Sequence, residues 1–475
     1  MNKTISAFTD DALGTMDAVA VAEAIAKGKI SVAEATEAAI ARAEKVNGEL
    51  NAIVLKTYDD ARNYNTLAKD GALYGVPSFI KDNDNLRGYP TQLGTGAFSA
   101  PKAKRNSPYV NQFLSTGVNY LGKSTLPEFG LICSTENEKW GITRNPWHTD
   151  YTTGGSSSGS AALVASGVVP IATANDGAGS IRIPAACCGL VGLKPSRKRL
   201  VDMEGSQLMP LQIVYQGVLT RTVRDTAAFY AEAEKFYRHK KLPELGHVKH
   251  AGKQRLRIAF FQNPAKGKIG HQDADTYRTQ QETAAVLQSL GHHVEQIPMP
   301  IDIDTMSVHY LNYYGFMAYV ITHWGQLIVN AKVDHGELEP FTIGLSKQFK
   351  TNALQTPKSI RMLRKTGREA EQLFEKYDVL MTPVVSHKTP EIGHFSTKLS
   401  YEDISRRAVE YASYAGLQNV TGAPAISLPL GIADNGMPLG VQLTAPYGLD
   451  KRLLELAYEL EEAKPWRFIY QYAGK

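Results

Sequence analysis

The sequence predicts an α/β fold that forms one interleaved domain. Residues 256–261 (LRIAFF), a helical stretch ending at Leu290 and residues 293–297 form a β-α-β pattern, which indicates parallel strands. Residues 161–174 have the pattern of an apolar helix followed by a strand. A length of 475 residues would ordinarily suggest two or three domains. Breaks in the pattern are few after residue 60, however, so we expect a single domain over residues 1–475.

The composition excludes several classes of protein. An apolar share of 43% with 21% charged residues is typical of a globular protein, and the net charge of +5 is small for this length. We therefore expect neither nucleic acid nor a membrane as a partner. Three cysteines, Cys133, Cys187 and Cys188, cannot form a disulfide framework, and the N-terminus lacks the apolar core of a signal peptide. These observations favour a cytoplasmic protein.

The N-terminal 70 residues are expected to be mostly helical. Residues 17–28 and 31–46 read as two helices, and Ser31 followed by Glu34 forms a capping box at the start of the second. An extended segment begins at residues 51–55. A polar helix is predicted for Tyr58–Lys69. None of these elements carries chemistry by itself.

The rest of the chain alternates between helices and strands. Helices are predicted at residues 107–114, 222–236, through most of 305–376, and at 453–462. Strands are predicted at residues 118–121, 379–383, 425–430 and 440–444. Residues 206–214 are expected to form a flap, and 237–254, which are rich in lysine and histidine, an exposed linker.

Two loops between residues 154 and 185 indicate the chemistry. One reads GGSSSG from Gly154 and the other GAGSIRIP from Gly177. Glycines let the backbone approach a ligand closely and leave N–H groups free to face a developing anion. Hydroxyl nucleophiles beside such donors suit acyl transfer.

Lys81 is a candidate base that the residues alone do not settle. It ends the strand-like stretch 75–81 (GVPSFIK), and functional sites in α/β folds collect at the ends of strands. Because Asp82 and Asp84 follow it and most lysines lie on the surface, a solvated lysine is the more common outcome.

Two other motifs match the spelling of known sites. Residues 117–124 (GVNYLGKS) match a phosphate-binding loop, but their four middle residues are strand formers. Gly155–Gly159 fits the Gly-x-Ser-x-Gly turn of Ser-His-Asp hydrolases, yet residues 145–153 show no strand pattern before it. His387 has the best context for a partner histidine. A Ser-His-Asp esterase therefore remains an alternative.

The loops at 154–185 resemble the amidase signature family. The family pattern Gly-Gly-Ser-Ser-x-Gly, then Asp, then Gly/Ala-x-Ser-Ile-Arg-x-Pro, is matched from Gly154 through Asp176 and Ser180 to Pro184. The likeness extends to NPW at 145–147 and to the stretches 189–195, 419–425 and 438–442. DGAGS at 176–180 and TPEIG at 389–393 look most like the 6-aminohexanoate-cyclic-dimer hydrolase branch.

This resemblance implies a fold, a reaction and a set of residues. The fold is one large mixed sheet covered by helices on both faces, and the reaction is hydrolysis of a small linear or cyclic amide through a serine acyl-enzyme. The implied roles are a triad of Lys81, Ser156 and Ser180; an oxyanion hole of Gly177, Ala178, Gly179 and Ser180; supporting residues Ser157, Asp176 and Arg182; and pocket residues Leu131, Cys133 and Tyr314.

Two details of the pattern need a particular backbone. The family has glycine where this chain has Ala178, so the oxyanion site requires a negative φ at that position. A cis peptide bond is expected at Gly155 or Ser156. Neither a cofactor nor a metal is expected, and the partner is a small-molecule amide.

The identity of the amide and the assembly remain open. A homodimer is one assembly that the sequence allows. The A subunit of glutamyl-tRNA(Gln) amidotransferase is a further alternative, although it typically has Gln where Ile183 precedes Pro184 here. The pocket is expected from the segments around 125–140, 205–215 and 305–350.

Overall fold

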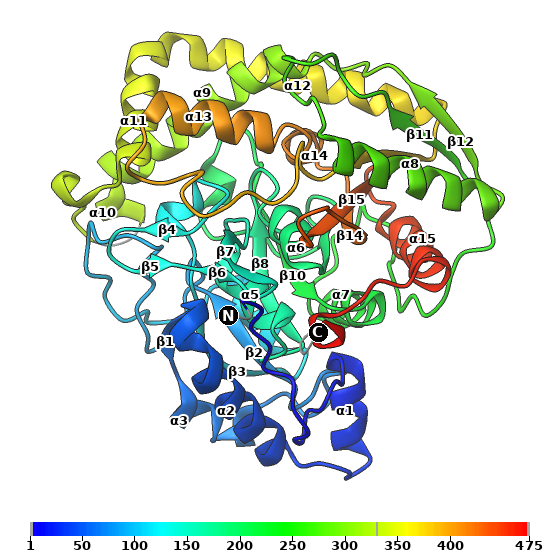
Figure 1. Ribbon diagram of the computed structural model, residues 1–475. Helices are drawn as coiled ribbons and strands as arrows, with labels where there is room; N and C mark the ends of the chain where they lie inside the picture. Colours follow the sequence, from blue (N-terminus) through cyan, green and yellow to red (C-terminus); the bar gives the residue numbers. More distant parts are fainter. Residues whose placement is uncertain (1–2, 329–330, 473–475) are drawn as a thin grey trace.

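The computed structural model describes residues 3–328 and 331–472. Its centre is an 11-stranded mixed sheet with the order β1-β3-β2-β8-β10-β9-β14-β15-β13-β11-β12 (Figure 1). In this order the strands are β1 (Ile53–Lys56), β3 (Asn119–Ser124), β2 (Pro77–Lys81), β8 (Ile171–Asp176), β10 (Tyr215–Thr220), β9 (Val191–Lys194), β14 (Ala425–Ile432), β15 (Pro438–Thr444), β13 (Val379–Pro383), β11 (Arg257–Phe261) and β12 (His293–Ile297).

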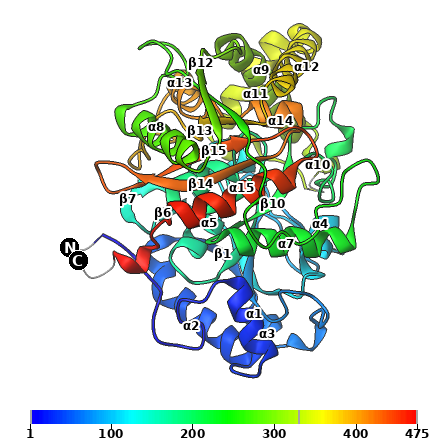
Figure 2. The ribbon, with the colours of Figure 1, turned by 90° about the vertical axis from the view of Figure 1, so that its right-hand side faces the viewer.

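Helices cover this sheet, and the predicted α/β fold is confirmed (Figure 2). They are α1 (Ala18–Ala26), α2 (Val32–Leu50), α3 (Tyr58–Ala61), α4 (Pro108–Leu114), α5 (Ser158–Ala165), α6 (Arg182–Cys188), α7 (Val223–Phe236), α8 (Ala274–Ser289), α9 (Ile303–His323), α10 (Gly325–Ile328), α11 (Pro340–Asn352), α12 (Thr356–Gln372), α13 (Tyr401–Tyr411), α14 (Leu417–Thr421) and α15 (Asp450–Ala463). Among the described residues, none of these helices has the length and apolarity needed to cross a bilayer.

Parallel strands lie at two places in the sheet. β2 runs parallel to both β3 and β8. At the other end β11 runs parallel to β12 and β13, as the β-α-β pattern of residues 256–297 predicts. The remaining neighbours pair antiparallel, including β8 with β10 and β14 with β15. The carboxyl ends of β2 and β8 therefore lie side by side.

The N-terminal helices form largely as predicted. The Ser31 hydroxyl oxygen accepts from the Glu34 amide at 3.1 Å and the Glu34 carboxylate accepts from the Ser31 amide at 2.7 Å, which completes the capping box of α2. The helix predicted at Tyr58–Lys69 is wrong, because α3 ends at Ala61 and only a 3-10 turn at Tyr64–Thr66 follows. Asparagine and threonine in that stretch are weak helix formers.

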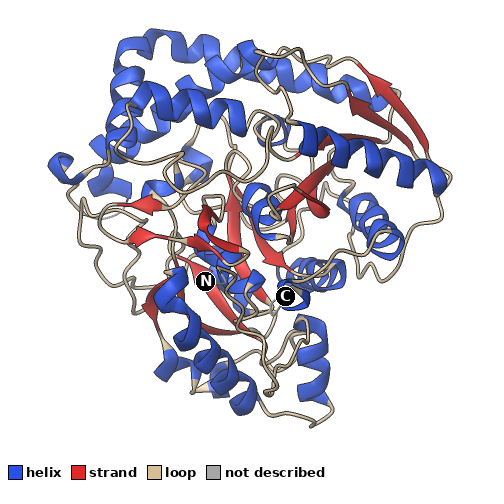
Figure 3. Ribbon diagram, viewed as in Figure 1, coloured by secondary structure: helices blue, strands red, loops and turns tan. Residues whose placement is uncertain are grey.

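A layer of helices lies over the carboxyl ends of β2 and β8. Figure 3 shows this layer at the top of the molecule, with most strands in the middle and β11 and β12 at the upper right. Helix α9 packs against α11 and α12, and α11 packs against α13. The predicted helical region 305–376 is thus confirmed for its described residues, and it supplies one wall of the site.

The stretch 237–254 contains neither helix nor strand. It is held to the body of the protein, because the side chains of Leu242, Leu245 and Val248 are buried. Pro243 also accepts a hydrogen bond from Arg199 at 2.6 Å. These contacts differ from the exposed linker that the charge pattern predicts.

Candidate active site

Lys81 is the last residue of β2, and its side chain is fully buried. Its Nζ atom lies 2.6 Å from Asn175 Oδ1, 2.8 Å from Ser156 Oγ and 3.1 Å from Ser157 Oγ. Asn175 comes from β8, whose parallel pairing with β2 brings the two strand ends together. Lys81 Nζ thus contacts two hydroxyl oxygens and one amide oxygen, and all three groups are neutral.

The burial of Lys81 changes its acid-base behaviour. Removal from water lowers the pKa of Lys81 to about 7, although Asp84 and Asp176 act in the opposite direction. A lysine with such a pKa is neutral in a large fraction of molecules at neutral pH, and only the neutral amine can accept a proton.

Ser156 lies in the loop between β7 (His148–Thr152) and α5. The peptide bond Gly155–Ser156 is cis, in agreement with the expectation for this position. Strand β7 pairs with β6 (Arg144–Asn145), so the prediction that residues 145–153 contain no strand is wrong. The residues of His148–Thr152 do not alternate between apolar and polar, because this strand lies in a two-stranded hairpin outside the large sheet.

Ser157 joins the two loops of the site. Its hydroxyl donates to the backbone carbonyl of Ser180 at 2.6 Å. Because the proton of Ser157 is engaged in this bond, its oxygen accepts from Lys81 Nζ. Ser157 is the central serine of the Gly-x-Ser-x-Gly motif. Its hydroxyl is hydrogen-bonded to both Lys81 and the loop of Ser180, and it therefore supports both.

Asp176 and Arg182 form a fully buried ion pair under the loop between them. Arg182 Nη2 lies 2.8 Å from Asp176 Oδ1, and Nε lies 2.9 Å from Oδ2. Burial alone would raise the pKa of Asp176, but the guanidinium of Arg182 lowers it to about 2. Arg182 also donates to four neutral acceptors, which are the side chains of Gln418, Asn419 and Gln442 and the carbonyl of Ala415.

The backbone of the loop 177–180 has the negative φ that the oxyanion site requires at Ala178. Among the described non-glycine residues, positive φ occurs at Asn51, Leu93, Phe129 and Lys198, so Ala178 has a negative φ. Gly179 has φ of +107°, a value that favours glycine. Its N–H donates to Asp176 Oδ1 at 2.7 Å and is therefore engaged below the loop. This geometry removes Gly179 from the predicted oxyanion donors and leaves Gly177, Ala178 and Ser180 as candidates.

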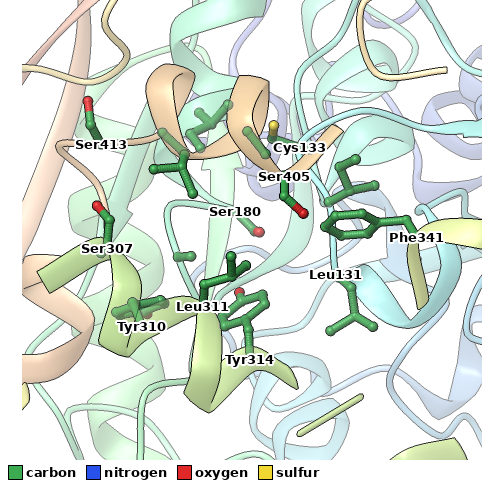
Figure 4. Close-up of a pocket in the computed structure, with 18 of the residues that line it drawn as sticks. Leu131, Cys133, Ser180, Ser307, Tyr310, Leu311, Tyr314, Phe341, Ser405 and Ser413 are labelled. Atoms are coloured by element: carbon green, nitrogen blue, oxygen red, sulfur yellow. The ribbon is translucent and has the colours of Figure 1, made fainter. Parts of the chain in front are cut away.

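A cavity opens in front of Ser180, a residue that is 7% exposed. Figure 4 shows Tyr310, Leu311 and Tyr314 of α9 on one side and Ser405 of α13 on the other. The residues that line it are Gly130, Leu131, Ile132, Cys133, Gly155, Ala178, Ser180, Ile183, Met306, Ser307, Tyr310, Leu311, Tyr314, Phe341, Ser405, Ala408, Val409, Ala412, Ser413 and Gly416. All of these side chains are uncharged, and most are apolar.

The three predicted pocket residues, Leu131, Cys133 and Tyr314, all lie in this wall. Of the predicted segments, 125–140 and 305–350 contribute, whereas 205–215 does not. The wall formed by residues 405–416 was missed, because α13 reads in sequence as a charged surface helix and only its inner side faces the cavity. Burial raises the pKa of the Cys133 thiol well above its usual range, which keeps this sulfur protonated.

The competing motifs have other roles. Lys123 of the phosphate-loop spelling lies within β3, is fully buried and pairs with Asp82 at 2.5 Å. The His387 ring packs edge-on against His394 and at a tilt against Tyr411, and it is not part of the cavity wall. In residues 3–328 and 331–472, no three His, Cys, Asp or Glu side chains are grouped as a metal site requires.

Sequence reasoning also missed Asn175, whose Oδ1 makes the shortest contact to Lys81 Nζ. The available signal was its position directly before Asp176 at the end of a predicted strand. Strand order is needed to use that signal, since Asn175 reaches Lys81 only because β8 lies next to β2.

Comparison with known proteins gives one consistent result. The family model described as Amidase matches residues 34–454. The Mycobacterium leprae (strain TN) protein named "Putative amidase AmiC" is 44% identical over 462 residues, which cover 97% of this chain and 98% of that protein. The 6-aminohexanoate-cyclic-dimer hydrolase of Pseudomonas sp. (strain NK87) is 32% identical over 479 residues, covering 95% of each. A solved structure of 6-aminohexanoate cyclic dimer hydrolase has a TM-score of 0.84 at 30% identity and covers 95% of this chain and 97% of its own.

Proposed function

The chain belongs to the amidase signature family, and on that premise we propose that it hydrolyses neutral amides with Lys81, Ser156 and Ser180 as its catalytic triad. The observation that carries this proposal is the 2.8 Å contact between Lys81 Nζ and Ser156 Oγ, in a site where the lysine touches only neutral oxygens. Ser180 lies at the cavity and its backbone is bonded to Ser157, the second hydroxyl at Lys81.

The first half-reaction forms an acyl-enzyme. Neutral Lys81 takes the proton of Ser156, which takes the proton of Ser180 as the Ser180 oxygen attacks the carbonyl carbon of the amide. The carbonyl π electrons move to oxygen, and in this proposal the backbone amides of Gly177, Ala178 and Ser180 receive the charge. When the tetrahedral intermediate collapses, the C–N bond breaks and the leaving nitrogen takes a proton from Ser156, which regains one from Lys81.

Water completes the cycle. It gives a proton to the same Ser156–Lys81 pair and attacks the ester, and the C–O bond to Ser180 breaks as that oxygen takes the proton back. Each half-reaction leaves Lys81 neutral, so the pair acts as a shuttle and the net change is amide plus water to acid plus amine.

The cavity supports a neutral substrate with a small apolar group. It offers no charged side chain to a charged substrate, and burying an unpaired charge among Leu131, Phe341 and Tyr314 would cost several kcal/mol. The volume is about 110 Å³, comparable with cavities of roughly 150 Å³ that hold one benzene. Small aliphatic or aromatic amides are the class we propose, and the likeness to a cyclic-dimer hydrolase adds cyclic amides.

Hydrolysis of a panel of neutral linear, aromatic and cyclic amides by the purified chain tests this function. Ser180→Ala and Lys81→Ala should each lose at least a thousandfold in kcat while the thermal unfolding curve stays close to wild type. Ser158→Ala is the matched control, since the Ser158 hydroxyl donates to the Gly154 carbonyl in the same loop and is hydrogen-bonded to neither Lys81 nor Ser180.

Two results would contradict the proposal in different ways. Near-wild-type turnover by Lys81→Ala, combined with loss of turnover in His387→Ala, would favour the Ser-His-Asp alternative. A wild-type chain that hydrolyses none of the amides would favour a subunit that needs a partner, as in a tRNA-dependent amidotransferase.

A further inference from the structure

The contacts of Lys81 determine where its protons lie. A neutral lysine amine has two N–H groups and one lone pair. Asn175 Oδ1 at 2.6 Å can only accept a hydrogen bond. Ser157 Oγ at 3.1 Å donates its own O–H to the Ser180 carbonyl in a hydrogen bond and therefore also accepts from Lys81. Both N–H groups of neutral Lys81 are thus bound, and the lone pair is left for the third neighbour, Ser156.

We propose that Asn175 is a positioning residue whose carbonyl oxygen holds one N–H of Lys81 and so directs the lysine lone pair at the hydroxyl of Ser156. This inference rests on the proposed role of Lys81 as the base. If Asn175 Oδ1 were removed, the amine could rotate about its last C–N bond and direct an N–H at Ser156 instead. That orientation offers no acceptor for the serine proton.

The neutrality of Asn175 matters as much as its oxygen. The charged groups that act on Lys81 are Asp84, on the loop after β2, and Asp176, at the end of β8. Asp176 is paired with Arg182, and Asp84 is buried and held by the hydroxyl of Ser107 and the amide of Gln216. Neither carboxylate is within hydrogen-bond distance of Lys81 Nζ, whose partners are Ser156, Ser157 and Asn175. An amide accepts the N–H without stabilising the protonated lysine as a carboxylate would.

Two substitutions separate the two properties of Asn175. Asn175→Leu keeps the approximate shape and removes the acceptor, whereas Asn175→Asp keeps the acceptor and adds a charge. The matched control is Asn119→Leu, because Asn119 is also a buried asparagine in the large sheet, on β3, but donates to Thr36 and Ala61 away from the site. The pH profiles of kcat and kcat/KM are measured for all four proteins on one neutral amide, with the folded fraction taken from circular dichroism.

Asn175→Asp should move the acid limb of kcat/KM upward by at least one pH unit, because the added carboxylate stabilises protonated Lys81. One pH unit corresponds to about 1.4 kcal/mol of this stabilisation. Its rate should approach that of the wild type at alkaline pH. Asn175→Leu should lower kcat about 10- to 100-fold across the profile at nearly unchanged KM, without an upward shift of the limb. Asn119→Leu should lower stability and leave the limb in place.

An acid limb at the wild-type position in folded Asn175→Asp overturns the inference, as does a wild-type kcat in Asn175→Leu. If Asn175→Leu does not fold, Asn175→Asp carries the test, because it keeps the size and shape of the side chain. Failure of the proposed function is distinct, since the wild type would then show no acid limb or Lys81→Ala would remain active.

Discussion

The buried pair Asp176–Arg182 leads to a prediction about stability. Asp176→Asn removes the negative charge but almost nothing of the shape, and it leaves the Arg182 guanidinium buried without a counter-charge. It also turns one acceptor oxygen into an NH₂ group that faces N–H donors of Gly179, Ile181 or Arg182. Breaking a buried pair in this way costs about 3–5 kcal/mol. The four neutral acceptors of Arg182 remain, so we expect a loss of about 3 kcal/mol in the free energy of unfolding.

Urea unfolding of wild type and Asp176→Asn at neutral pH measures this loss. A double-mutant cycle with Asp176→Leu, Arg182→Met and the combined variant gives the sign of the coupling, because replacing both members of a buried pair by apolar groups is often close to neutral. Glu37→Gln, which breaks an exposed pair with Arg62, is the control and should cost less than about 1 kcal/mol. A loss below about 1 kcal/mol in Asp176→Asn would refute the reasoning.

The same pair gives the direction of a pH effect on folding. The pKa of Asp176 lies below its ordinary value, so the stabilising contribution of this carboxylate is fully present above pH 4. It is lost as the pH falls from about 4 towards 2. Asp176→Asn should therefore differ from the wild type in stability most at neutral pH, and the two curves should converge in acid.

Three further predictions concern activity. Because the pKa of Lys81 is about 7, kcat/KM of the wild type should fall about tenfold between pH 8 and pH 6, and an amide-hydrolysis assay that gives a flat profile over this range would contradict the neutral-lysine base. Gly179→Ala would place a Cβ 2.6 Å from Ala415 Cβ at a φ of +107°, so it should lower the unfolding free energy by at least about 1–3 kcal/mol and reduce kcat, whereas Gly28→Ala, with open space around it, should affect stability alone; equal kcat values in the two variants would argue against a loop held by close packing. Phe341→Ala enlarges the cavity and should shift the preferred amide to a bulkier one, by about 10-fold in the ratio of kcat/KM values for two amides that differ by one ring; an unchanged ratio would place the substrate elsewhere.

Local sequence patterns were sufficient to predict most helices and strands and the two loops at 154–159 and 177–184. The capping box at Ser31 and the β-α-β unit at 256–297 depend on short stretches of sequence, and both form as predicted. Contacts between distant segments were beyond the same reasoning. The cavity wall at 405–416 and the Asn175–Lys81 contact depend on helix packing and strand order, and Lys81 and Asn175 are 94 positions apart in the sequence. The engaged N–H of Gly179 could not be predicted either, since it requires the orientation of the Asp176 carboxylate.

The distinction between Lys81 and the other buried lysines shows why the lysine base has to be identified from contacts. Lys81, Lys123 and Lys194 each lie in a strand of the large sheet, and all three are fully buried. Lys123 lies 2.5 Å from the Asp82 carboxylate and donates to the Pro90 carbonyl and the Thr91 hydroxyl, so its contacts are all acceptors. Lys194 donates to the Pro195 carbonyl and lies 3.9 Å from the centre of the Tyr215 ring, and neither partner has a proton to give to the amine in that geometry.

Lys81 combines burial with a hydroxyl neighbour that is free to donate. Its pKa is lowered, its two acceptor contacts engage both N–H groups, and Ser156 is the remaining neighbour at 2.8 Å. A base needs both a lone pair at working pH and an acidic proton in front of it. Lys123 pairs with a carboxylate, and its hydroxyl neighbour Thr91 donates to the Asp84 carbonyl. Lys194 faces a carbonyl and an aromatic ring. Neither lysine therefore has a proton donor in front of it. Burial alone does not distinguish the three lysines of this sheet. The proposed base is distinguished by the hydrogen-bond partners that lie around Lys81 at the ends of β2 and β8.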